Sequence, residues 1–127
     1  MPVRERSEHY VNNKEFLIAI IEYRRKVTNV AEKEIEGFSD LDEEEKFQTL
    51  KSWKSKNKPR ISNYLGDCFL KIATHLSYKP NFVNYMFRED MISDGIENCV
   101  QYMLNFNPDK SSNPFAYFTQ IIHYAFL

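Results

Sequence analysis

Three carboxylates are spaced along one side of a helix that we predict over residues 89–105. Asp90, Asp94 and Glu97 stand at i, i+4 and i+7, which places them on a single helix face. No Lys or Arg falls on that face. Because like charges at helical spacing destabilise a helix by about 0.2–0.5 kcal/mol per pair, the face is either a plain solvated surface or a binding site for a basic partner. The opposite side carries an apolar stripe of Ile92, Ile96, Cys99, Val100 and Met103.

A second candidate surface lies on a helix that we predict from Pro114 onwards. Asn113 is a favourable N-cap, and Pro114 suits the first helical position. One face carries Tyr117, Gln120, Ile121 and Tyr124. The opposite face, which needs a core to pack on, carries Phe115, Phe118, Ile122 and Phe126. Exposed aromatic rings accept unstacked nucleic-acid bases at about 1–3 kcal/mol each. The alternative is a helix buried all round, whose tyrosine hydroxyls find partners inside the protein.

No residue pattern predicts a catalytic centre, a cofactor site or a metal site. Cys68 and Cys99 fall on predicted apolar helix faces and lack Cys-x-x-Cys spacing, so they are most simply buried thiols. Together with His75 and His123, the two cysteines could in principle provide four metal ligands. However, no two of the four residues have the sequence spacing usual for metal ligands. The sequence also has no glycine-rich phosphate loop and no Gly-x-Ser-x-Gly motif. We therefore expect neither an enzyme nor a cofactor-binding protein.

Two further amphipathic segments must form the scaffold for these faces. The first begins at Asn12 or Asn13, and its apolar residues are Phe16, Leu17, Ile20, Ile21 and Val27. The second begins at Pro59 and continues to Leu76, with Gly66 as a place where another helix could approach closely. Only three glycines and five prolines interrupt the 127 residues, and no run alternates like a strand. The sequence predicts one all-α domain over residues 1–127, a compact helical bundle whose polar residues 1–9 are frayed.

Residues 28–58 are expected to form a partly helical acidic insertion. Residues 27–50 hold eight acidic and two basic side chains, whereas residues 51–60 hold five basic and no acidic ones. A weak apolar stripe in this part consists of Phe47, Leu50 and Trp53. Because Trp53 lies inside the basic segment 51–60, a nucleic-acid contact is one interpretation of that segment. An ordinary basic linker is the other.

The overall charge and hydropathy exclude two classes of protein. A net charge of −1 is not that of a protein which binds duplex DNA by itself. It is compatible with a subunit that reads DNA only when docked on a larger basic enzyme. No apolar run is long enough for a membrane span, and no stretch resembles a signal peptide. We therefore expect a soluble intracellular protein.

Three motifs in this chain resemble, in order and spacing, the second conserved region of bacterial sigma factors. They are Asp90-Met91-Ile92-Ser93-Asp94-Gly95, Phe106-Asn107-Pro108 and Tyr117-Phe118-Thr119. In that family a D-L-I-x-E-G helix leads through an F-D-P turn into an aromatic helix, and residues 68–73 are similar to the helix that precedes it. Residues 10–15, 19–21 and 114–117 resemble, more narrowly, the late-transcription sigma factor of large tailed bacteriophages.

The resemblance implies a protein that binds the bacterial core RNA polymerase and captures the melted nontemplate strand of promoter DNA. Contacts with the coiled coil of the largest polymerase subunit are implied for Asp90, Ser93, Asp94, Glu97 and Val100. DNA contacts are implied for Phe115, Tyr117, Thr119, Gln120 and Tyr124. Tyr117 falls on the family's tyrosine that stacks with an extruded adenine. The implied role is late phage transcription in the host cytoplasm, from short AT-rich promoters of the minus-ten type.

The chain departs from the family's pattern at several positions. Gln120 and Ile121 replace paired tryptophans of the family. We therefore expect this chain to recognise the double-stranded edge of the promoter element differently or more weakly than the family does. Pro114 stands where an aromatic residue is usual, and Ile96 replaces an asparagine that contacts polymerase. The C-terminal part of the family is expected to be missing, so binding to a sliding clamp and a late co-activator would require residues not in this chain. The alternative function is a helical polymerase-binding regulator that does not read DNA.

Overall fold

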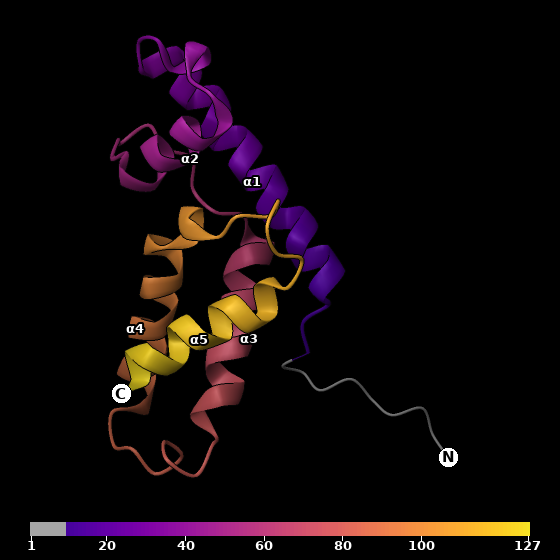
Figure 1. Cartoon of the computed structure of the whole chain (residues 1–127). Helices are drawn as coiled ribbons and strands as arrows, with labels where there is room; N and C mark the ends of the chain where they lie inside the picture. Colours follow the sequence, from indigo (N-terminus) through magenta and orange to yellow (C-terminus); the bar gives the residue numbers. More distant parts are fainter. Residues whose placement is uncertain (1–9) are drawn as a thin grey trace.

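The computed structural model describes residues 10–127, which form five α-helices and two 3-10 turns without any strand. The elements are α1 (Asn13–Glu34), η1 (Phe38–Asp40), α2 (Glu43–Ser52), α3 (Asn63–Ser77), α4 (Arg88–Gln101), η2 (Met103–Asn105) and α5 (Pro114–Phe126). α3 and α4 run side by side, and α5 crosses both of them (Figure 1). α1 packs on α3 and α5. The predicted all-α fold is confirmed, while the expectation for residues 1–9 lies outside the described range.

Polar residues precede four of the five helices and satisfy free N–H groups of the first turn. The side-chain oxygen of Asn12 accepts a hydrogen bond from the Glu15 N–H at 3.1 Å. The corresponding caps of α2, α3 and α5 are Asp42, Ser62 and Asn113. Because Ser62 provides the cap, α3 begins at Asn63 and not at the predicted Pro59. α4 follows Phe87 without a side-chain cap.

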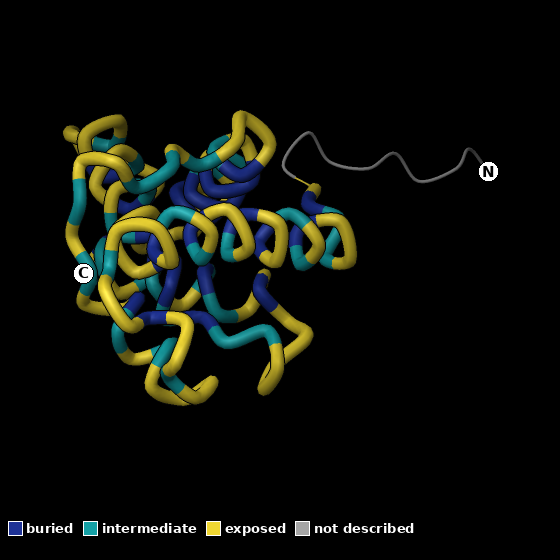
Figure 2. Tube along the Cα trace, turned by 90° about the horizontal axis from the view of Figure 1, so that it is seen from above, coloured by how far each residue is buried: buried dark blue, intermediate teal, exposed yellow. Residues whose placement is uncertain are grey.

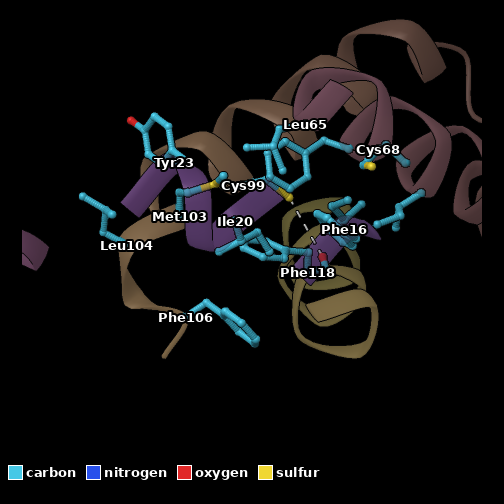
Figure 3. Close-up of a cluster of buried hydrophobic side chains, with 14 of the residues drawn as sticks. Phe16, Ile20, Tyr23, Leu65, Cys68, Cys99, Met103, Leu104, Phe106 and Phe118 are labelled. Atoms are coloured by element: carbon cyan, nitrogen blue, oxygen red, sulfur yellow. Dashed lines mark hydrogen bonds between the residues drawn. The ribbon is translucent and has the colours of Figure 1, made fainter. Parts of the chain in front are cut away.

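Phe118 of α5 lies at the centre of the core and has no exposed surface. Its ring centroid is 5.7 Å from that of Phe16 in α1 and 5.0 Å from that of Phe69 in α3. Phe106, which follows η2, lies 6.0 Å from it. Figure 3 shows Phe16 and Phe118 close together, with the Cys99 thiol of α4 directed at the Phe118 carbonyl oxygen. In Figure 2 the buried stretches accordingly lie on the inward sides of the helices. Each buried aromatic ring removes about 150–250 Å² from water, so this cluster fixes the helices relative to one another.

The acidic segment 28–58 is partly helical, and its first residues belong to α1. α1 continues past Thr28, and the chain turns at Gly37, whose φ of 77° lies in the left-handed region that glycine adopts without strain. The next residue, Phe38, is fully buried, and Leu50 anchors α2 in the core. The segment is therefore packed onto the bundle by its own apolar side chains, although most of its surface is charged.

Gly95 allows α4 and α5 to approach closely. A Cβ atom at this position would lie 3.1 Å from Cγ2 of Ile122 and 3.1 Å from Cε1 of Phe126, whereas carbon atoms normally rest about 3.5–4.0 Å apart. At Gly66 the nearest atom to a Cβ would be Cδ1 of Ile61, at 3.9 Å. The predicted close approach at Gly66 is therefore wrong, and the glycine that performs this role is Gly95.

Candidate functional site

All five residues for which polymerase contacts are implied lie exposed on the outer side of α4: Asp90, Ser93, Asp94, Glu97 and Val100. We call Asp90, Asp94 and Glu97 the acidic face. Within residues 10–127 the only ion pair joins Arg25 to Glu22, at 2.7 Å. No described cation is therefore paired with a carboxylate of the acidic face. Within the part of the chain that the structure describes, these charges are not used in ion pairs.

The buried side of α4 differs from the predicted stripe. Its buried residues are Met91, Gly95 and Cys99. Ile92 and Ile96 are only half-buried at the edge of the core, and Val100 is 43% exposed. The shift follows from Gly95, because α5 packs directly over the position that lacks a side chain. Burial raises the pKa of the Cys99 thiol to about 12, so this thiol stays protonated and unreactive at neutral pH.

An exposed apolar segment lies next to the acidic face. It consists of Val83, Tyr85, Met86 and Phe87, in the connection between α3 and α4, and we call it the apolar loop. Met86 is 83% exposed and Phe87 is 55% exposed. Tyr85 and Phe87 share a hollow of about 320 Å³ with Asp90 and Asp94. Clustered exposed apolar side chains are typical of a protein-binding surface. The prediction from sequence missed this loop, although four apolar residues within positions 83–87 gave a signal.

α5 keeps part of its predicted aromatic face on the surface. Tyr124 is 62% exposed, and Gln120, which lies one turn before it, is exposed as well. Phe115 was predicted to pack in the core but is 38% exposed. Its neighbour Pro114 is buried and takes the inward position at the start of α5, which leaves Phe115 at the rim.

Tyr117 and Thr119 lie between core and surface. The Tyr117 ring packs 5.2 Å from the ring of Phe106, and burial raises the pKa of the Tyr117 hydroxyl. The hydroxyl oxygen of Thr119 is buried and has no hydrogen-bond partner among the described residues. The five residues implied in DNA contact therefore divide into two groups. Phe115, Gln120 and Tyr124 are exposed, whereas Tyr117 and Thr119 present only part of their side chains.

Two polar side chains hold α5 in place at its start. Asn13 of α1 donates a hydrogen bond from Nδ2 to Oδ1 of Asn113 at 3.0 Å, and its own Oδ1 accepts one from the Phe115 N–H at 3.1 Å. Arg24 donates to the backbone oxygens of Leu104 and Phe106, both at 3.2 Å. α1 therefore fixes both the turn that leads into α5 and the first turn of α5. Sequence patterns had assigned neither role.

Neither a search for metal-binding groups nor comparisons with known proteins assign a function to this chain. Among residues 10–127, no three His, Cys, Asp or Glu side chains are grouped as metal ligands, and Cys68 and Cys99 are buried free thiols. No helix in the described part of the chain combines the length and apolarity needed to cross a membrane. No protein-family model, curated protein or solved structure matches this chain. Its function must therefore be inferred from its surfaces.

Proposed function

We propose that this chain is a sigma-type transcription initiation subunit of the class used for late transcription by large tailed bacteriophages. The outer side of α4 binds the core RNA polymerase of the host, and the outer side of α5 captures the melted nontemplate strand of an AT-rich promoter element. The protein acts in the host cytoplasm. It supplies no catalytic group, because the polymerase performs the chemistry.

The unpaired acidic face of α4 is the observation that carries this proposal. An ion pair within the chain would have to be broken before a partner could use these carboxylates, and none of the described cations forms one. A cationic helix pair, such as the coiled coil of the largest polymerase subunit, is complementary in charge. The apolar loop beside Asp90 adds a hydrophobic contact area to the charged one.

The outer side of α5 supports the DNA-binding half of the proposal. Extruding a base from a duplex costs a few kcal/mol, and stacking on an aromatic ring returns about 1–3 kcal/mol per base. Tyr124 offers an exposed ring for such stacking, and Gln120 beside it offers hydrogen-bonding groups. α5 contains no Lys or Arg. It would therefore bind bases while the polymerase or another part of the chain holds the phosphates.

The second candidate is a polymerase-binding regulator that does not read DNA. Two observations favour it: Tyr117 is partly packed against Phe106, and α5 lacks cations. In this function α4 binds the polymerase in the same way, while α5 serves only as part of the core. The two candidates therefore agree about α4 and differ about α5.

Binding and run-off transcription separate the candidates. Asp94→Lys should weaken binding to bacterial core polymerase at least about tenfold, because like charges brought together at an interface cost several kcal/mol. The matched control is Glu32→Lys, which reverses an exposed acid on α1, away from the acidic face. Both variants should keep the circular dichroism spectrum of the parent. Equal affinity of the two variants for polymerase would contradict the assignment of α4.

Run-off transcription from an AT-rich promoter then tests α5. Core polymerase with this chain should produce a specific transcript that core polymerase alone does not produce. Binding to polymerase without that transcript would favour the regulator, since the regulator needs α4 alone.

A further inference from the structure

A basic cleft lies between the connection from α2 to α3 and the C-terminal end of α4. Its volume is about 940 Å³, and four cationic side chains line it: Lys51, Lys54, Lys58 and Arg60. None of the described residues that line it is an Asp or a Glu. In a chain with a net charge of −1 this is a concentrated positive site.

The cations of the basic cleft are not neutralised from within the described part of the chain. None of them forms an ion pair there, since the only such pair is Arg25–Glu22. Glu34 accepts hydrogen bonds from the Ser55 hydroxyl at 2.7 and 2.9 Å, but it does not line the cleft. Burial, followed by the charge of Lys54, lowers the pKa of Lys58. An anion in the cleft would offset the charge repulsion between Lys54 and Lys58.

Aromatic and amide groups share the cleft with the cations. Trp53 is half-buried and lines the cleft, and Tyr102 is 40% exposed on the side formed by the end of α4. Gln101 and Asn105 add donors and acceptors. Cations alone would suit any polyanion, such as an acidic peptide. Cations next to flat rings and amides suit a ligand that carries phosphates and bases together. The volume also falls within the range of about 300–1,000 Å³ that is usual for ligand sites.

We infer that the basic cleft binds a short segment of single-stranded nucleic acid, with phosphates held by Lys54, Lys58 and Arg60 and a base placed against Trp53. This site is separate from α5 and does not depend on the function proposed for that helix.

Trp53 provides a direct readout, because it is the only tryptophan of the chain. Titration of the full chain with short single-stranded oligonucleotides, DNA in one series and RNA in another, should quench its fluorescence. The fluorescence polarisation of a labelled oligonucleotide should rise over the same concentration range. Quenching by only one of the two nucleic acids identifies which strand the cleft takes. Absence of quenching by both would overturn the inference.

Charge reversal tests the phosphate contacts. Lys54→Glu with Arg60→Glu, two exposed positions, should weaken binding at least about tenfold. The slope of log affinity against log salt concentration should also become shallower by about 1.4, because each lost single-strand phosphate contact contributes about 0.7. The matched control, Lys14→Glu with Lys79→Glu, makes the same change of net charge at exposed positions that do not line the cleft. Equal affinity of the two double variants would overturn the inference.

Two further measurements test whether the cleft binds an acidic peptide instead, and whether α5 binds the strand instead of the cleft. A polyglutamate peptide should not quench Trp53, and quenching by the peptide at lower concentrations than by the oligonucleotides would assign the cleft to acidic proteins instead. Trp53 lines the cleft, so its quenching reports a strand in the cleft, whereas Tyr124→Ala tests the outer side of α5. Quenching that is lost in Tyr124→Ala but kept in Lys54→Glu with Arg60→Glu would show that α5 and not the cleft holds the strand.

Discussion

Replacing Gly95 by alanine tests whether α4 and α5 pack as closely as the geometry indicates. The new methyl group would lie 3.1 Å from Cγ2 of Ile122, and Ile122 has no exposed surface, so neither group can move aside without disturbing the core. Overpacking of this kind costs about 1–3 kcal/mol. Replacing glycine by alanine inside a helix stabilises the helix by about 1 kcal/mol, which offsets part of this cost. We expect the free energy of unfolding of Gly95→Ala to fall by up to about 2 kcal/mol.

Gly66→Ala is the matched control for this variant. It also places a methyl group inside a helix, but the nearest atom, Cδ1 of Ile61, would lie at an ordinary 3.9 Å. Gly66→Ala should therefore raise the free energy of unfolding by about 0.4–1 kcal/mol. Urea denaturation followed by far-UV circular dichroism measures both values. Helix propensity cancels in their difference, which isolates the crowding at Gly95. Equal stability of the two variants would refute the reasoning.

Two other predictions concern α5. Phe118→Ala removes the ring at the centre of the core and should lower the free energy of unfolding by about 3–5 kcal/mol in the same assay; a loss below about 1 kcal/mol would contradict its central position. Tyr124→Ala should weaken the capture of AT-rich single strands by the polymerase complex about tenfold, whereas Tyr124→Phe keeps the ring and should bind as the parent does. An equal loss in both Tyr124 variants would assign the contact to the hydroxyl group and not to the ring.

The existence and type of the helices could be predicted from the sequence because their caps and apolar periods are local signals. Asn12 and Asn113 mark helix starts through hydrogen bonds to N–H groups only a few residues away. The exposure of the acidic face could be predicted as well, since charged side chains are rarely buried without partners. These features depend on neighbours along the chain and on little else.

The details of both surfaces could not be predicted, because they depend on residues that are distant in sequence. Gly66 and Gly95 look alike as glycines inside amphipathic helices, and only the crossing of α5 over α4 makes the second one essential for packing. Tyr117 lies on the predicted exposed face, yet Phe106 from the preceding turn covers part of its ring. Helical periodicity gives the direction of a side chain but not what lies opposite it.

The polarity of α4 helps to explain how a chain of net charge −1 presents two surfaces of opposite sign. The N-terminal end of a helix carries partial positive charge and its C-terminal end partial negative charge, each worth about 0.3–1 kcal/mol to a suitable ion. Glu89 and Asp90 stand in the first turn of α4, whereas the basic cleft includes Gln101, its last residue. The helix dipole therefore favours Asp90 at the N-terminal end and the cations of the α2–α3 connection at the other, whereas Asp94 and Glu97 lie beyond the first turn. The net charge does not indicate this arrangement, because the negative charges of the acidic face and the positive charges of the basic cleft cancel in the sum. Each surface can still bind a partner of opposite sign.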